Sequence, residues 1–111
     1  MLQFIQDSVD ALNQDDFSIV LDHFGSNGGA KNEYSSYLEN IKDRVEHEDF
    51  FGGELLDLED HGDYLEVTML ENYGIEYTDG EVKDVQNRAV YKVTRSNGDF
   101  KVNEYLNIEQ Q

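Results

Sequence analysis

The chain has 111 residues, of which 8 are basic and 25 are acidic, so its formal net charge at pH 7 is −17. That length is enough for one hydrophobic core but not for two, and we expect a single domain over residues 1–111. The negative charge repels the phosphates of nucleic acids and anionic lipids, which argues against both as partners. A cationic partner fits the charge, and so does a simple requirement for solubility.

The composition is that of a folded protein without disulfides. Hydrophobic residues make up 38% of the chain, and seven Tyr and six Phe can supply large buried surfaces. The absence of Cys excludes disulfides, zinc–thiolate sites and a cysteine nucleophile, but it leaves the cellular compartment open. No apolar run reaches the roughly 20 residues of a membrane span, and no signal peptide opens the chain. The chain is therefore either a complete cytosolic protein or a domain of a longer one.

The first 45 residues show helical periodicity in three segments. The first helix is predicted from Leu2 to Leu12, and the polar stretch NQDD then interrupts it. Asp15 or Asp16 is the expected N-cap of a second helix, whose apolar stripe is formed by Phe17, Val20, Leu21 and Phe24. A glycine-rich loop over residues 25–32 follows, and it lacks the Gly-Lys-Ser/Thr ending of a phosphate-binding loop. The third helix is predicted from the spacing of Tyr34, Tyr37, Leu38, Ile41 and Val45.

After Val45 the apolar residues alternate, which predicts strands. We expect these over residues 51–58, 64–77 and 82–94, with a last strand that includes Phe100–Leu106. Two glycines in the first of these suggest a bulge or a bend. Asn97-Gly98 is a strong hairpin signal before the last strand. Helices followed by strands indicate an α+β fold, with three helices packed in the hollow of a curled four-stranded antiparallel meander.

This pattern resembles that of the NTF2-like (cystatin-like) cone fold. The stretch ALNQDDFSIV, residues 11–20, is similar to the first helical corner of that superfamily. A closer resemblance is to the C-terminal NTF2-like domain of the TcaA/YvbJ-type membrane-anchored proteins of Gram-positive bacteria. It is carried by YSSYLENI at 34–41, YLEVTMLENYGIEY at 64–77 and RAVYKVTRSNGDFKVNEYLNI at 88–108, together with the absence of Cys. The similarity is one of pattern and includes no invariant motif.

The closer resemblance implies a place in the cell envelope. The domain would lie on the extracytoplasmic face of a Gram-positive cell membrane, at the end of a chain with a membrane helix and a zinc ribbon. Such proteins are linked to glycopeptide sensitivity, and the family offers no catalytic residues to carry over. The function it implies is a non-enzymatic interaction or ligand-sensing module, whose partner is a cell-wall polymer, a cationic ligand or another protein. The alternatives are a cytoplasmic location and a homodimer formed through the exposed face of the sheet.

The NTF2-like resemblance also defines where a binding pocket would lie. Enzymes of that superfamily place a carboxylic acid and a tyrosine inside the cone, where an apolar environment raises the pKa of the acid. Glu104 alternates in phase with Phe100, Val102 and Leu106, so we expect it to point inside, with Arg88 or a tyrosine as its partner. Glu66 and Glu71 are expected to face solvent. The candidate pocket residues are Tyr34, Tyr37, Tyr73, Tyr91, Arg88 and Glu104, and the alternative function is a small isomerase or hydrolase.

No motif assigns a metal, a cofactor or a catalytic group. His23, His47 and His61 are not spaced as paired metal ligands, and we interpret them as surface histidines. Residues 57–63 resemble the first half of a calcium-binding loop, but Thr68 stands where the loop needs a bidentate Glu. An acidic hairpin turn explains this stretch, and weak calcium binding is the alternative. No spacing of Ser, His and Asp suggests a catalytic triad.

Overall fold

A computed structural model describes residues 1–25, 28–41, 43–96 and 99–111. Three helices come first, α1 (Leu2–Gln14), α2 (Ser18–Leu21) and α3 (Ala30–Ile41). The strands β1 (Val45–Asp60), β2 (Leu65–Tyr77), β3 (Val82–Ser96) and β4 (Asp99–Gln110) follow. They form one antiparallel sheet in the order β1-β2-β3-β4. The predicted α+β class and the predicted meander are therefore confirmed.

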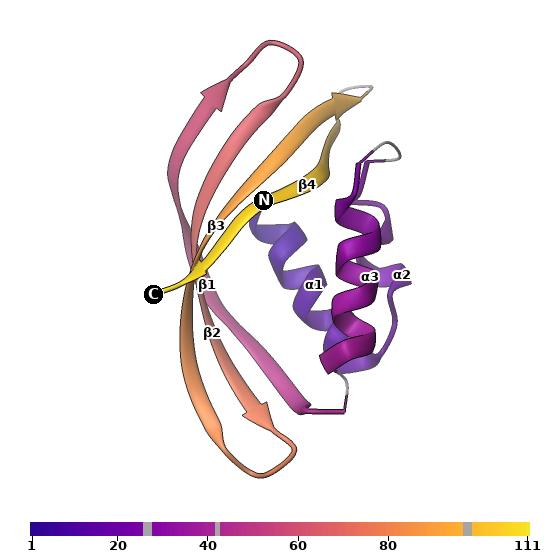
Figure 1. Ribbon diagram of the computed structural model, residues 1–111, viewed down its shortest axis with the longest axis vertical. Coiled ribbons are helices and arrows are strands. Elements are labelled where there is room, and N and C mark those ends of the chain that lie inside the picture. Colours follow the sequence, from indigo (N-terminus) through magenta and orange to yellow (C-terminus); the bar gives the residue numbers. More distant parts are fainter. Residues whose placement is uncertain (26–27, 42, 97–98) are drawn as a thin grey trace.

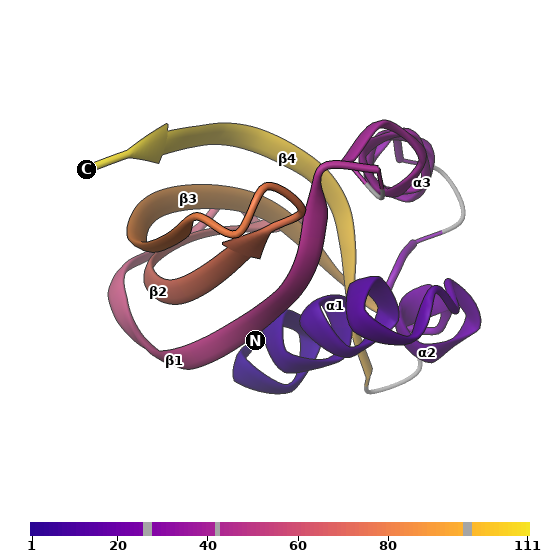
Figure 2. The ribbon, with the colours of Figure 1, turned by 90° about the horizontal axis from the view of Figure 1, so that it is seen from below.

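The sheet curls, and the helices lie on its concave side. Figure 1 shows the strands bent into an arc with α1 and α3 inside it, and Figure 2 shows the same curl viewed from below. Alternate residues of each strand face the helices because successive side chains of a strand point to opposite faces. The core joins these residues to the inner faces of the helices, and its members include Phe4, Ile5, Val20, Phe24, Tyr34, Leu65, Val67, Met69, Tyr91, Val93 and Val102.

The break between α1 and α2 is built by two aspartates. Asp15 adopts a left-handed conformation with φ 50° and ψ 46°, which ends α1. The N–H of Asp15 donates to the carbonyl of Leu12 at 3.3 Å, and the N–H of Asp16 donates to the carbonyl of Ala11 at 3.0 Å. The N-cap of α2 is Phe17, so the prediction of an aspartate cap is wrong. The carboxylate of Asp16 nevertheless accepts the N–H of Ser18 at 3.0 Å and thus satisfies a free donor of the first turn.

The second helix is shorter than predicted because its last residues pair with the sheet. The α2 helix ends at Leu21, and Phe24 forms an isolated parallel bridge with Val102 of β4. The N–H of Val102 donates to the carbonyl of His23 at 2.7 Å, and the N–H of Gly25 donates to the carbonyl of Val102 at 2.9 Å. This pairing anchors the segment after α2 along the edge of β4 that does not pair with β3.

The first strand begins earlier than its sequence pattern suggested. We expected Val45 in the third helix and a strand from Phe51, but α3 ends at Ile41 and β1 begins at Val45. Glu48 occupies an inward position in the early part of β1. Because it is polar, the alternation of apolar and polar residues that marks a strand is not visible in this part of the sequence. The predicted glycine bulge is confirmed, because the register shifts between Phe50 and Gly52 and the φ of Gly52 is 117°. The predicted Asn97-Gly98 turn lies outside the described residues.

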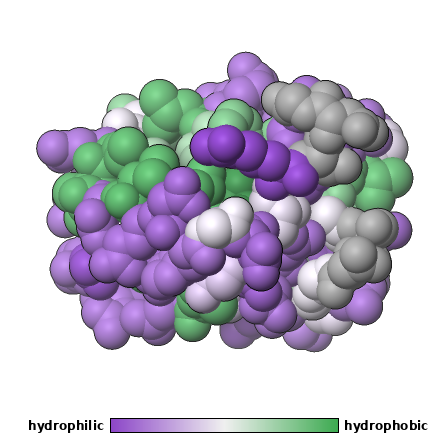
Figure 3. Space-filling model, turned by 90° about the horizontal axis from the view of Figure 1, so that it is seen from above, coloured by the Kyte–Doolittle hydropathy of each residue, from purple (hydrophilic) through white to green (hydrophobic). Residues whose placement is uncertain are grey.

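Seen from above, hydrophilic residues cover much of the molecular surface, and hydrophobic side chains gather toward one side (Figure 3). Exposed apolar side chains of β1 include Leu55, Leu56 and Leu58.

The outer face of the sheet carries charge, since the register aligns Glu59, Glu66, Lys92 and Glu104 in one row across the strands. The expected homodimer through the sheet stays a prediction.

Candidate functional site

The hollow between α1, α3 and the inner face of the sheet contains a cavity of ≈ 290 Å³. Apolar residues of α1 form one wall, and side chains from all four strands form the other. The lining residues are Phe4, Ile5, Ser8, Val9, Leu12, Glu33, Tyr34, Tyr37, Glu48, Glu71, Tyr73, Ile75, Asn87, Tyr91, Tyr105 and Ile108. The cavity is thus apolar along its length, ringed by tyrosines and supplied with carboxyl groups.

The four tyrosines named from the sequence all line this cavity. Tyr34 and Tyr37 reach it from α3, where their rings lie 5.8 Å apart, and the Tyr34 hydroxyl donates to the carbonyl of Ser8 on α1. Tyr73 and Tyr91 reach it from β2 and β3. Tyr105 of β4 joins them, with its ring 5.4 Å from that of Tyr91. Their role as ligand-binding residues stays a prediction.

Glu71 lies inside the cone, so the expectation that it faces solvent is wrong. It is only 3% exposed, and both of its carboxylate oxygens accept a tyrosine hydroxyl: Tyr73 to Oε1 and Tyr91 to Oε2, each at 2.5 Å. Burial raises the pKa of Glu71 above its ordinary value, and the two hydrogen bonds oppose that rise. Glu71 is a buried acid whose acceptors are satisfied.

Glu48 is a second buried acid, and one of its acceptors is not satisfied. It is 7% exposed, and its Oε2 atom is buried without a hydrogen-bond partner among the described residues. Burial raises the pKa of Glu48 to about 7; the nearby charge of Glu71 adds to this, and His47 opposes it. The carboxyl group of Glu48 therefore changes its charge near neutral pH.

Asn13 at the end of α1 fixes the backbone of Glu48. Its side-chain amide donates to the Glu48 carbonyl at 2.7 Å, and its side-chain oxygen accepts the Glu48 N–H at 2.8 Å. This paired contact holds α1 against β1 beside the cavity. It is a positioning contact, because it places Glu48 without reaching the cavity itself.

Glu104 and Arg88 lie outside the cavity, so the expectation that they form its polar centre is wrong. The register of β3 and β4 shifts between Val90 and Tyr91 and again between Lys92 and Val93. Each shift adds a residue to β4 and inverts the alternation of its side chains, so Tyr105 rather than Glu104 faces inward. Glu104 pairs instead with Lys92 at 3.9 Å on the outer face, and Arg88 is exposed.

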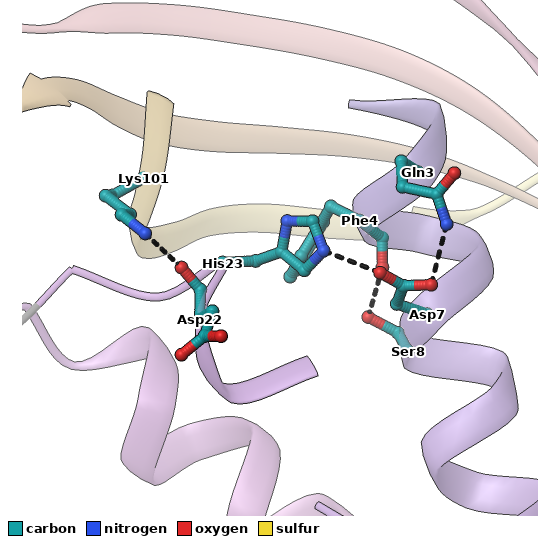
Figure 4. A network of polar contacts seen from close by, with 7 residues as sticks. All are labelled: Gln3, Phe4, Asp7, Ser8, Asp22, His23 and Lys101. Atoms are coloured by element: carbon teal, nitrogen blue, oxygen red, sulfur yellow. Dashed lines mark hydrogen bonds and ion pairs between the residues drawn. The ribbon is translucent and has the colours of Figure 1, made fainter. Parts of the chain in front are cut away.

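His23 is not a lone surface histidine. Its Nε2 atom lies 2.7 Å from Oδ2 of Asp7 on α1, and its ring packs edge-on against Phe4. The side chain of Lys101 donates to the carbonyl of neighbouring Asp22 (Figure 4). These contacts tie the segment after α2 to both α1 and β4.

The acidic stretch around His61 forms the turn between β1 and β2, as predicted. Gly62 has a φ of 87°, and its N–H donates to the Asp60 carboxylate at 2.9 Å. Nearby, ligand atoms of Glu59, His61 and Glu66 lie within 4.8 Å of one another. These side chains are solvent-accessible, and Nε2 of His61 lies 3.4 Å from Oε2 of Glu59 and 3.5 Å from Oε2 of Glu66.

Comparison with known proteins places this architecture in a family. The sequence profile of the TcaA protein NTF2-like domain matches residues 1–106. No curated protein matches the chain in sequence. Among the described residues, no helix has the length and apolar character needed to cross a membrane.

Solved structures share the fold at low sequence identity. A Novosphingobium aromaticivorans protein, provisionally named an aromatic ring hydroxylase, superposes with a TM-score of 0.66 at 15% identity, covering 98% of this chain and 89% of the other. An NTF2-like protein of unknown function from Burkholderia pseudomallei gives a TM-score of 0.54 at 13% identity, covering 98% and 87%. These likenesses establish the NTF2-like fold and carry no activity.

Proposed function

The chain belongs to the family of TcaA protein NTF2-like domains, and from that premise we propose that it is a non-enzymatic binding module whose ligand enters the tyrosine-lined cavity. The family suggests a membrane-anchored parent protein. We place the module on the extracytoplasmic side of a Gram-positive cell, where it senses or binds a component of the envelope. The overturned role of Glu104 leaves this proposal intact, because other residues supply the polar groups of the cavity.

One observation carries the proposal. The cavity contains an acid, Glu48, that is 7% exposed and has an unpartnered Oε2 atom. Burying such an atom costs roughly 1–3 kcal/mol, and a core with a purely structural role would fill the position with an apolar side chain. A ligand that enters the cavity lined by Glu48 and donates a hydrogen bond to Oε2 would satisfy this atom.

Co-sedimentation with purified Gram-positive cell walls tests the module. Ile108 lines the cavity and is 52% exposed, so Ile108→Trp narrows the opening at little cost to folding. Leu106 is exposed on the same strand and does not line the cavity, which makes Leu106→Trp the matched control. We expect the wild type and Leu106→Trp to sediment and Ile108→Trp to stay in solution. An absence of wild-type binding at every ionic strength would contradict the proposal.

A second candidate function is acid–base catalysis. Glu48 stands in a largely apolar cavity, and its pKa of about 7 suits a general base near neutral pH. The reaction would be proton abstraction next to a carbonyl group. Deuterium incorporation into small cyclic ketones, followed by NMR, measures it directly. Loss of the exchange in Glu48→Gln would favour the enzyme, and exchange no faster than in buffer would exclude it for these substrates.

A further inference from the structure

The cavity contains acidic side chains without a matching basic one among the described lining residues. Glu48 and Glu71 are buried in its wall, and Glu33 stands at its edge. No Lys, Arg or His occurs among the lining residues that the structure describes. Buried carboxylates are normally paired with a cation or satisfied by hydrogen bonds. Here the hydrogen bonds satisfy Glu71 but leave Oε2 of Glu48 free, so one buried acceptor of the site has no hydrogen-bond donor among the described residues.

The aromatic walls favour a cation as well. Five tyrosines line the cavity: Tyr34, Tyr37, Tyr73, Tyr91 and Tyr105. The faces of aromatic rings carry negative electrostatic potential and attract ammonium groups, an effect that strengthens when water is excluded. Carboxylates combined with aromatic rings therefore favour a positively charged group over a neutral or an anionic one.

We propose that the ligand of this cavity is a protonated primary amine on an apolar chain, with its ammonium group donating a hydrogen bond to Oε2 of Glu48. The inference rests on the proposed function, since it names the ligand class of the same site. A primary ammonium is preferred over a quaternary one because Oε2 needs an N–H donor, which a quaternary nitrogen lacks. The apolar chain lies along the α1 wall, against Ile5, Val9 and Leu12.

The two acids have different parts in this site. Glu48 contacts the ligand, because its free oxygen is the acceptor. Glu71 is held by the hydroxyls of Tyr73 and Tyr91 and contributes its charge from behind them. The cavity of ≈ 290 Å³ admits a small group, such as a single amine-bearing side chain of a polymer, rather than a bulky ligand.

Binding of an amine is expected to depend on pH through Glu48. The cation favours the ionised carboxylate, and that form is lost as the pH falls below about 7 in the empty site. The affinity for the amine then decreases by up to tenfold per pH unit below that point, because each ligand must displace a proton. Above this range the affinity is constant until the amine itself loses its proton.

Calorimetric titration with n-hexylammonium, with n-hexanol as its neutral counterpart, tests the proposal. We expect binding of the amine at pH 8, at least tenfold weaker binding of n-hexanol, and a comparable loss in Glu48→Gln. Glu54→Gln is the matched control, because Glu54 is an exposed residue of the same strand, and its affinity should equal that of the wild type. Equal affinities for the amine and the alcohol, or an unchanged affinity in Glu48→Gln, would overturn the inference.

A second arm separates this inference from the proposed function. Cell walls treated with acetic anhydride lose their free amino groups, and we expect the wild type to stop sedimenting with them. If it still sediments and Ile108→Trp does not, the cavity binds a wall component that is not an amine, and only the inference fails. If no walls are bound but n-hexylammonium binds through Glu48, the amine site stands and the envelope function fails.

Discussion

Two glutamates on the inner face of the sheet differ in one respect that decides their chemistry. Glu71 has both oxygens hydrogen-bonded to tyrosines, whereas Glu48 has a buried oxygen without a partner. Burial destabilises the ionised form of both acids, but only Glu71 has tyrosine hydrogen bonds that offset this cost. The cone therefore contains one acid, Glu71, whose hydrogen bonds stabilise the fold, and a second acid, Glu48, whose free oxygen is available to a ligand.

Glu48 makes the stability of the protein depend on pH. Burial raises its pKa from 4.5 in the unfolded chain to about 7, so the folded state holds the proton more tightly. The stabilisation is full below pH 4.5 and is lost as the pH rises through 7, by roughly 3 kcal/mol in total. Glu48→Gln should remove this loss and be more stable than the wild type at pH 8 in urea denaturation. Glu54→Gln is the control, and an equal pH dependence in both variants would contradict the assignment.

The hydroxyl of Tyr91 is expected to stabilise the fold through Glu71. Tyr91→Phe removes the 2.5 Å bond to Oε2 and leaves that buried oxygen without its donor. We expect a loss of about 1–3 kcal/mol in the free energy of unfolding at pH 8, measured by chemical denaturation. Tyr73→Phe removes the bond to Oε1 at a less buried position and should cost less. A Tyr91→Phe protein as stable as the wild type would show that water replaces the hydroxyl.

The sequence contained a readable signal for one of these acids and not for the other. Glu71 lies in phase with Leu65, Val67 and Met69, so alternation alone places it on the inner face. Its polarity argued against that position, and only the two tyrosine hydroxyls explain why it is tolerated. Glu48 precedes the stretch that reads as a strand, and its burial depends on the packing of α1 against β1, which no local pattern contains.

At the scale of the elements, bulges decide which side chains enter the cone. The alternation of apolar residues predicted that Glu104 points into the cone. This prediction fails because β4 has two additional residues relative to β3. Nothing in residues 99–110 marks those positions, since no glycine occurs there. The bulge in β1 was predictable, because Gly52 supplies the backbone conformation it needs. Helices before strands, and the α+β class, followed directly from periodicity.

The β1 bulge is expected to require glycine. Gly52 has a φ of 117°, and a Cβ atom built there would meet no atom within 4 Å. Gly52→Ala therefore isolates backbone strain from packing, and we expect a loss of roughly 1–3 kcal/mol in the free energy of unfolding. Thermal and urea denaturation measure it. Unchanged stability would mean that the strand adopts another register at this point, which amide hydrogen exchange across β1 and β2 would reveal.

At the scale of the whole molecule, the charge of −17 is spread over a small surface. Its self-repulsion destabilises the compact state, and salt screens that repulsion. We expect the free energy of unfolding to rise by roughly 1 kcal/mol between 0.02 and 0.5 M NaCl. Sodium chloride suits this test because sulfate would also strengthen hydrophobic burial. A stability that falls with NaCl would indicate that specific ion pairs outweigh the net repulsion.

The same charge attracts cationic groups to the molecule, while the cavity selects among them. Surface attraction weakens with salt, whereas binding to the buried Glu48 is screened much less. Wall binding that persists at high ionic strength would therefore come from the cavity rather than from the acidic surface.

The measurement that tests the account most directly is an NMR titration of the glutamate side-chain carboxyl carbons, with and without n-hexylammonium. We predict that Glu48 titrates with a pKa of about 7 in the free protein and that the amine lowers this pKa. Glu54 should titrate identically in both samples. If Glu48 titrates near 4.5, or if the amine leaves its titration unchanged, the result would contradict the claim that Glu48 is a buried acid that binds an ammonium group in the cavity.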